Sequence, residues 1–161
     1  RPSFQKEGIF TAGNAPGLND GGAALVVSSS SYADANGLKP IARVTGYAVA
    51  GTPPQDLFFA PIYAVQKLMK KMNVDINHFD LIEANEAFSI QALADGKALG
   101  WDWNRVNVNG GAVALGHPIG ASGARILTPL IYALKDRGKK TGMAPLCLGG
   151  GNAVALAIEL V

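Results

Sequence analysis

Short apolar runs alternate with longer amphipathic stretches along this chain, and glycine-rich segments separate them. We expect strands at the apolar runs, which are residues 24–28, 41–50, 79–84, 106–108, 143–148 and 153–161. We expect helices at the amphipathic stretches, which are residues 30–36, 61–72, 87–99 and 122–135. Strands alternating with helices favour a mostly parallel sheet with helices packed on it. The pattern predicts one α/β domain that ends in an antiparallel hairpin.

Glycine and proline mark where the expected helices begin and end. Gly37, Gly100 and Gly138 each follow the last residue of a helical stretch, where a left-handed backbone ends many helices. Pro61 suits a first helical turn because its missing N–H has no partner there anyway. Residues 13–22 are typical of a loop. In open α/β sheets the chemistry sits in loops outside the strand ends, so loops with unusual residues are the candidate sites.

Composition sets the class of protein. The 161 residues can bury a sizeable core, since 48% are hydrophobic and 16% are charged. The net charge is +2, and the only basic pairs, 70–71 and 139–140, favour neither nucleic acid nor a membrane surface as a partner. No apolar run approaches the roughly 20 residues that cross a bilayer. The single cysteine, Cys147, excludes an internal disulfide and favours a reducing compartment such as the cytoplasm. The start at Arg1 suggests a fragment or a processed product.

The first candidate loop covers residues 83–88, between an expected strand and an expected helix. Asn85 stands where a helix N-cap residue belongs, because its side chain can accept a bond from a helix N–H. Its amide could instead position a water molecule or a substrate oxygen. The sequence leaves both roles open.

The second candidate loop covers residues 109–123 and is rich in glycine. His117 stands between Gly116 and Pro118, directly before an expected helix. A lone histidine is usually a surface or core residue, but small residues let a ligand approach the backbone closely, which strengthens the functional alternative. The phosphate-binding patterns G-x-x-x-x-G-K-[ST] and G-x-G-x-x-G are both absent.

The third candidate loop covers residues 147–151 and follows a strand. A single cysteine in an apolar strand is often inert packing. Three glycines directly after Cys147 would expose the thiol and leave backbone N–H groups to point at an anionic or polarised oxygen. Asn85, His117 and Cys147 could also form a cysteine hydrolase site, with histidine as the base and asparagine as its orienter.

Taken together, these loops resemble the thiolase family. The resemblance rests on the motifs Asn-Glu-Ala-Phe at 85–88, a glycine- and histidine-containing run at 110–125, Cys-Leu-Gly-Gly-Gly at 147–151, and the stretches 11–14 and 17–21. Thiolases contain two similar α/β halves and a loop domain, and residues 1–161 look like the C-terminal domain, with the first residues leading from the other half. The resemblance implies a mixed, mostly parallel sheet with helices on it. It also implies that the nucleophilic cysteine lies in the N-terminal half.

The resemblance assigns a role to each candidate residue. His117 would activate the nucleophile and donate a hydrogen bond to a thioester oxygen, and Asn85 would hold a water molecule that completes this oxyanion site. Cys147 would act as acid and base by removing the α-proton of a second acyl-CoA, and the N–H of Gly149 would line a second oxyanion site. A thiolate is a usable base when nearby dipoles lower the pKa of its thiol from about 8.5.

Substrate contacts are implied at Pro16, Leu57, Ala87 and Phe88. Two of them depart from the family pattern, because Pro16 replaces a frequent serine and residues 57–61 replace Met-Gly-x-Gly-Pro. A third departure is Asn152-Ala153, where Gln-Gly is more usual. The bulk of residues 57–59 predicts a preference for short acyl groups if the two phenyl rings fill an acyl pocket, whereas the rings could instead pack the core. These changes bear on acyl specificity and leave the implied reaction type unchanged.

The implied function is acyl transfer between coenzyme A thioesters, with no cofactor and no metal. The implied partners are the N-terminal thiolase half, acyl-CoA substrates and further copies in a homo-oligomer, with neither nucleic acid nor a membrane. Two alternatives remain at this point. Another condensing enzyme of the superfamily would more typically carry a second catalytic histidine, whereas His78 stands in a polar turn. A non-catalytic assembly module would not need Asn85, His117 and Cys147.

Overall fold

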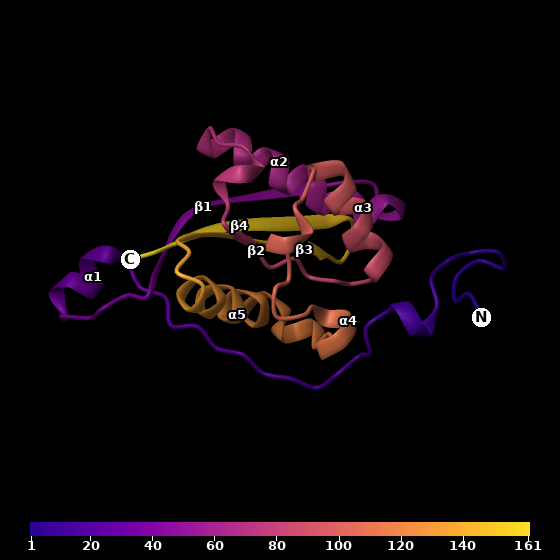
Figure 1. The fold of residues 1–161 in the computed structure, drawn as a ribbon, viewed down its shortest axis with the longest axis horizontal. Helices are drawn as coiled ribbons and strands as arrows, with labels where there is room; N and C mark the ends of the chain where they lie inside the picture. The colour runs from indigo at the N-terminus through magenta and orange to yellow at the C-terminus, as the bar shows by residue number, and fades with distance from the viewer.

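The computed structural model describes residues 1–161 and contains one four-stranded sheet (Figure 1). Its strands are β1 (Ala42–Gly51), β2 (Leu81–Ile82), β3 (Thr141–Leu148) and β4 (Asn152–Leu160), in the order β1-β4-β3-β2. The β1/β4 and β3/β4 pairs are antiparallel, and the β2/β3 pair is parallel. The expected mixed α/β fold and its final hairpin are confirmed. Parallel pairing is nevertheless in the minority, because β4 lies at the centre and runs against both of its neighbours.

Helices cover both faces of the sheet. They are α1 (Ser30–Ala35), α2 (Ala60–Met72), α3 (Ser89–Leu99), α4 (Ala112–Leu115) and α5 (Ser122–Asp136). α2 and α3 lie on one face, and α4 and α5 lie on the other (Figure 1). The four expected helices are confirmed within two residues at each end, whereas the single turn α4 was not expected. None of these helices combines the length and the apolar character needed to span a bilayer.

The two faces of the sheet carry two separate cores, because strand side chains alternate between faces. On β4, Ala153, Ala155 and Ala157 pack into the core under α2. Ile158 belongs to the core under α5, with Leu156 packed against it. The alanines let α2 approach the sheet closely, while larger side chains fill the space on the α5 face. Residues on alternate positions of one strand therefore meet different environments.

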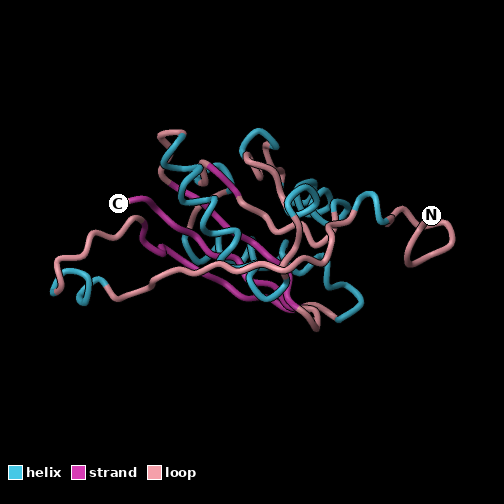
Figure 2. The backbone as a smooth tube through the Cα atoms, turned by 90° about the horizontal axis from the view of Figure 1, so that it is seen from below, coloured by secondary structure: helices cyan, strands magenta, loops and turns pink.

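The expected strand at residues 24–28 is wrong. This segment forms no strand, and Val26 is 100% exposed. It belongs to a long extended stretch that runs past α5 between the N-terminus and α1 (Figures 1 and 2). An apolar segment becomes a strand only when a neighbouring strand offers free backbone groups, and no strand of this chain pairs with it.

Two other expected strands are shorter than the sequence suggested. The run at 79–84 forms β2 over two residues only, although the hydrogen bonds Glu83 N–H to Met143 O and Asn85 N–H to Pro145 O continue its alignment with β3. The run at 106–108 forms a single bridge between Val106 and Ile82. Asn107 has a φ of 47°, which breaks the extended backbone there.

Candidate active site

All three candidate loops meet at one edge of the sheet. The last residue of β1, Gly51, and the last residue of β3, Leu148, both pair with Asn152 at the start of β4. β2 runs parallel to β3, so its carboxyl end points the same way. The N-terminus of α5 lies toward this edge as well, because a short turn joins the other end of α5 to the start of β3 (Figure 1). The three loops therefore lie at one sheet edge, while the convergence of Asn85, His117 and Cys147 on one cleft stays a prediction.

Asn85 follows β2 and does not cap a helix. The cap position of α3 is Phe88, and no side chain caps this helix, so the capping alternative is wrong. The Asn85 side chain is 1% exposed, and its Oδ1 accepts a hydrogen bond from Arg125 Nη2 at 3.4 Å. Its Nδ2 is buried and donates to no protein group. A buried, unpaired donor is costly, so this amide is suited to hold an oxygen of a bound molecule.

Glu86 attaches the second candidate loop to the end of β2. Its two carboxylate oxygens accept bonds from Asn107 Nδ2 and from the backbone N–H of Val113, both at 2.9 Å. Gly111 allows this contact, because a Cβ there would collide with the Glu86 carboxylate. No sequence motif assigned a role to Glu86. Two features of the sequence could have pointed to this role, namely the position of Glu86 beside Asn85 and the glycine at position 111.

His117 is positioned by the hydroxyl of Ser122, to which no sequence motif assigned a role. His117 Nδ1 lies 2.8 Å from Ser122 Oγ, and Ser122 Oγ donates to Pro118 O at 3.1 Å. The hydroxyl has one hydrogen, so its oxygen accepts from the histidine and the proton sits on Nδ1. Burial, and then the Arg125 charge, lower the pKa of His117 below its ordinary value. The imidazole is therefore neutral at neutral pH and keeps Nε2 free as a proton acceptor.

The backbone around His117 joins the N-terminal segment to the site. The His117 N–H donates to Gly17 O at 3.2 Å and to Asn19 Oδ1 at 3.3 Å. Ser89 Oγ at the start of α3 donates to Asn14 O at 2.7 Å. Pro16 lies between these two attachments, so it is held at the same edge as His117. Gly116, directly before the histidine, has a φ of 99°, which only glycine adopts without strain.

A buried acid, Glu83, stands two residues before Asn85 in the chain. Glu83 is 2% exposed, and burial raises its pKa to about 7. The nearby Arg125 charge lowers this pKa in part, and Glu86 raises it. Since Arg125 also contacts Asn85 and acts on His117, one guanidinium connects these three groups.

Cys147 lies on β3 opposite Ala153 of β4, and its side chain is half-buried. Burial raises the pKa of its thiol, and the Asp95 charge raises it further. This is the opposite of the lowering by dipoles that a ready thiolate base requires. Gly149, two residues on, is exposed, and its N–H donates to no protein group. The N–H is therefore free to meet an oxygen, as expected.

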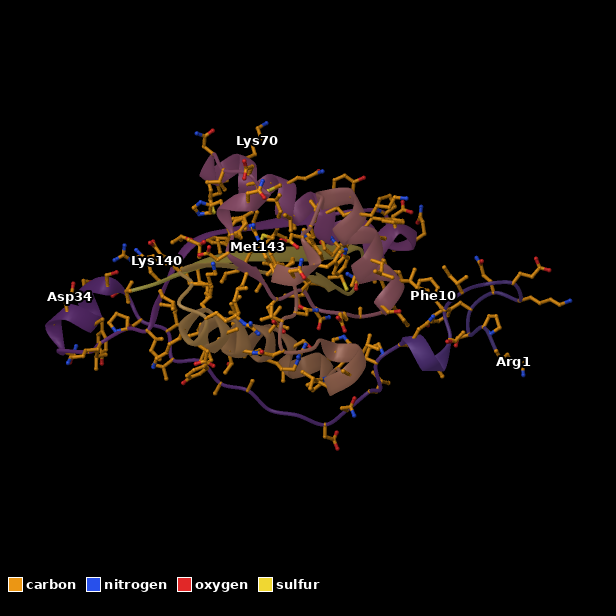
Figure 3. The ribbon with its side chains drawn as sticks, in the orientation of Figure 1. Arg1, Phe10, Asp34, Lys70, Lys140 and Met143 are labelled. Carbon is orange, nitrogen blue, oxygen red and sulfur yellow. The ribbon has the colours of Figure 1, made fainter.

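Leu57 and Phe88 reach the same edge from two further elements. Leu57 lies on the 3-10 turn η2 (Pro54–Phe59), which follows β1 and contacts α3, β3 and β4. The Phe88 ring lies 5.1 Å from the rings of both Phe58 and Phe10. Phe10 lies at this end of the molecule, near α3 (Figure 3). Of the two phenylalanines after Leu57, Phe58 thus packs into an aromatic cluster, whereas Phe59 is 48% exposed.

Ala87, the remaining predicted substrate contact, lies in the segment between Asn85 and Phe88. Its N–H donates to Gln91 Oε1 at 3.1 Å. No group of three or more histidine, cysteine, aspartate or glutamate side chains is arranged to hold a metal ion. The edge thus offers a neutral histidine, a thiol and two free hydrogen-bond donors. Such a set can move protons and stabilise an oxyanion without a metal.

Comparison with known proteins shows which family has this fold and these site residues. Residues 38–160 match the family described as "Thiolase, C-terminal domain", and residues 1–31 match "Thiolase, N-terminal domain". The chain is therefore a member of the thiolase family. It is 55% identical over 159 residues to an acetyl-CoA acetyltransferase of Escherichia coli K12, covering 99% of this chain and 40% of that protein. An acetyl-CoA acetyltransferase of Chromobacterium violaceum is 52% identical, with 99% and 41% covered.

Solved structures agree with this membership. The acetyl-CoA acetyltransferase of Bacillus anthracis superposes with a TM-score of 0.96 at 50% identity, covering 100% of this chain and 41% of that one. The Acat5 thiolase of Ascaris suum, determined in complex with coenzyme A, has a TM-score of 0.90 at 43% identity, with 100% and 42% covered. The chain thus spans about two-fifths of the length of the relatives that it matches.

Proposed function

We propose that the protein containing this chain transfers acyl groups between coenzyme A thioesters. Either it joins two acetyl-CoA molecules into acetoacetyl-CoA and coenzyme A, or it runs the reverse thiolysis. Residues 1–161 are assigned to the C-terminal domain and the segment that leads into it. The observation that carries the proposal is the gathering of Asn85, His117 and Cys147 at one sheet edge, in a chain about half identical to acetyl-CoA acetyltransferases.

In this proposal, His117 serves the first half-reaction. The nucleophile is a cysteine thiol supplied from outside this chain, because Cys147 is the only cysteine in it. Nε2 of His117 takes the proton of that thiol while Ser122 keeps the other proton on Nδ1. The thiolate then attacks the thioester carbonyl, and coenzyme A leaves as a thiol after it takes the proton of Cys147, which leaves Cys147 as a thiolate. The buried Nδ2 of Asn85 holds the water molecule that completes the oxyanion site.

Cys147 serves the second half-reaction. Its thiolate removes an α-proton from the second acyl-CoA, and the resulting enolate carbon attacks the acyl group on the nucleophile. The N–H of Gly149 donates to the oxygen that becomes negative during this attack. One such donor stabilises a transition state by about 3 kcal/mol. Two residues thus serve the oxyanion sites, Asn85 in the first and Gly149 in the second. The two proton transfers are made by His117 and Cys147.

Substrate recognition is assigned to the surroundings of this edge. Pro16, Leu57, Ala87 and Phe88 contact the acyl-CoA, and Phe58 limits the space beside Phe88. The reaction uses coenzyme A thioesters as substrates and needs no further cofactor or metal. The partners are an N-terminal thiolase half and further copies of the enzyme, and the compartment is the cytoplasm. The exposed run at 24–28 pairs with strands of the N-terminal half, which agrees with its match to that domain.

The test is complementation. The purified chain is assayed for thiolysis of acetoacetyl-CoA, first alone and then with a separately expressed N-terminal thiolase half. We expect no turnover by the chain alone, because no acyl-enzyme can hold the two thioesters together, and turnover once both halves have been refolded together. Turnover by the chain alone would overturn the role of Cys147. Folded assembly of both halves without turnover would favour a non-catalytic assembly module.

A further inference from the structure

Asn107 has a backbone conformation that residues other than glycine rarely adopt. Its φ is 47°, and the only other residue of this kind is Asn73, with a φ of 55°. Asn73 follows α2, where a left-handed residue commonly ends a helix. Asn107 instead follows Val106, which forms the bridge to Ile82. Strained backbone of this kind clusters at functional sites, so the contacts of the Asn107 side chain become the question.

The side chain of Asn107 takes the place of a neighbouring strand. The backbone N–H of Asn107 donates to Ile82 O at 2.9 Å, and the positive φ then turns the chain away from β2. The next backbone groups on this side of the β2 segment belong to Ala84. Asn107 Oδ1 accepts the N–H of Ala84 at 2.8 Å, and Asn107 Nδ2 donates to Ala84 O at 3.0 Å. One side-chain amide thus satisfies both backbone groups of Ala84.

Asn107 also holds the residue that follows Asn85. Its Nδ2 donates to Glu86 Oε1 at 2.9 Å, while Glu86 Oε2 accepts the N–H of Val113 at 2.9 Å. Glu86 is therefore fixed at both carboxylate oxygens. The two chain neighbours of Asn85 consequently bind the same amide through three hydrogen bonds of ordinary length.

The opposite edge of the same segment is bound to β3. Asn85 donates its N–H to Pro145 O at 3.0 Å, so the backbone of residues 84–86 has partners on both edges. The Asn85 side chain accepts from Arg125 at Oδ1, which leaves the buried Nδ2 as its free donor. The direction of that donor depends on the backbone that carries it, and Asn107 fixes this backbone on the side away from β3.

We propose that Asn107 is a positioning residue that directs the Asn85 amide, and thereby sets the place of the water molecule in the first oxyanion site. The assignment of that water molecule rests on the proposed function, whereas the three hydrogen bonds of Asn107 do not. A misplacement of about 1 Å can slow a reaction about a hundredfold. Loss of the Asn107 side chain should therefore slow acylation without weakening substrate binding.

The test removes the Asn107 side chain and keeps its backbone conformation. Asn107→Gly loses all three hydrogen bonds, and glycine adopts a positive φ without strain. Asn73→Gly is the matched control, because Asn73 also has a positive φ and is exposed outside the candidate site. Both variants are made in the complete enzyme. Single-turnover labelling at several acetyl-CoA concentrations gives the maximal rate of acylation and the concentration at half-maximal rate.

We expect Asn107→Gly to lower the maximal rate of acylation by at least about tenfold and to change the half-maximal concentration by less than about twofold. An oxyanion donor acts in the transition state, so its displacement leaves the binding of the substrate nearly unchanged. Asn73→Gly should match the unsubstituted enzyme. An unchanged rate in folded Asn107→Gly, or a loss confined to affinity, would overturn the proposal.

A double variant shows whether Asn107 acts through Asn85. Asn85→Ala combined with Asn107→Gly should be no more than about threefold slower than Asn85→Ala alone, because no amide remains to be positioned. Independent effects that multiply would overturn the positioning role and leave the acyl-transfer function untouched. If Asn85→Ala by itself leaves acylation unchanged, the role of Asn85 in the proposed function is wrong, and the positioning role is overturned with it.

Another substitution decides the question if circular dichroism shows that Asn107→Gly does not fold. Asn107→Asp keeps the size of the side chain and the acceptor for the Ala84 N–H, and aspartate also tolerates a positive φ. Its carboxylate cannot donate to Ala84 O or to Glu86. We expect the same selective slowing of acylation and the same result in the double variant with Asn85→Ala. Unslowed acylation in folded Asn107→Asp would overturn the proposal.

Discussion

The α5 side and the α3 side of the candidate site give the two titratable groups His117 and Cys147 opposite surroundings. On the α5 side, Arg125 lies near Glu83 and Asn85, and together with burial it lowers the pKa of His117. On the α3 side, no cation reaches Cys147, and burial with Asp95 raises the pKa of the thiol. Both shifts favour the neutral form at neutral pH, a bare imidazole nitrogen on one side and an intact thiol on the other. A single sheet edge thus prepares one group to accept a proton and the other to donate one.

The largest expected effect comes from removing the thiol on the α3 side while the histidine on the α5 side is kept. Cys147→Ser in the complete enzyme should slow condensation by about 10²- to 10⁴-fold, because a serine hydroxyl is a far weaker acid than a thiol. Acylation of the nucleophile should remain, since it depends on His117. Trapping of labelled acyl-enzyme measures the first step, and formation of acetoacetyl-CoA measures the second. His117→Ala is the matched comparison and should lose acylation. Equal loss of labelling in both variants would contradict the assignment of acylation to His117 and condensation to Cys147.

The buried acid on the α5 side should make stability fall as pH rises. Burial raises the pKa of Glu83 from 4.5 to about 7 in the folded chain. The folded state therefore binds a proton more tightly, and its contribution is full below pH 4.5 and lost as pH rises through 7. Glu83→Gln should remove up to about 3 kcal/mol of this dependence in urea unfolding at pH 5 and pH 8. Exposed Glu7→Gln is the control, and an unchanged pH slope in Glu83→Gln would show that Glu83 is charged throughout.

The tautomer of His117 should depend on one hydroxyl. Ser122→Ala removes the acceptor of the Nδ1 proton and the donor to Pro118 O. We expect a loss of about 1–2 kcal/mol in the free energy of unfolding. In ¹⁵N spectra of the imidazole, the population protonated at Nε2 should grow. Ser28→Ala, at an exposed position, should change neither quantity. A variant that keeps the Nδ1 proton would show that the backbone alone orients the ring.

The smallest expected effect concerns the aromatic cluster beside both sides. Phe58→Ala should open space next to Phe88, whose ring lies 5.1 Å from that of Phe58. We expect kcat/KM for a ten-carbon ketoacyl-CoA, relative to acetoacetyl-CoA, to rise by about tenfold at most in the complete enzyme. Phe59→Ala is the control, because that ring is half exposed. If the complete enzyme without substitutions already prefers the long substrate, the cluster does not limit chain length.

The sequence by itself determined the helices, the final hairpin and the loops that carry the site. These features depend on residues close together in the chain. Apolar spacing sets α2 and α5, Gly100 and Gly138 adopt the left-handed backbone that ends a helix, and three glycines join β3 to β4. Motif order was enough to identify Asn85, His117 and Cys147 as candidates, because each stands beside a strand end or a helix start.

Only the tertiary structure decided which apolar run becomes a strand and which acid becomes buried. Residues 24–28 have strand composition but no strand partner in this chain, whereas β2 needs only two paired residues beside β3. Glu83 and Asp95 look like ordinary acids in the sequence, yet folding places them at 2% and 0% exposure. The Cys147 thiol was expected to benefit from dipoles, but burial and Asp95 act against its ionisation. Strand pairing, burial and charge proximity all join residues distant in sequence, so local patterns carry no information about them.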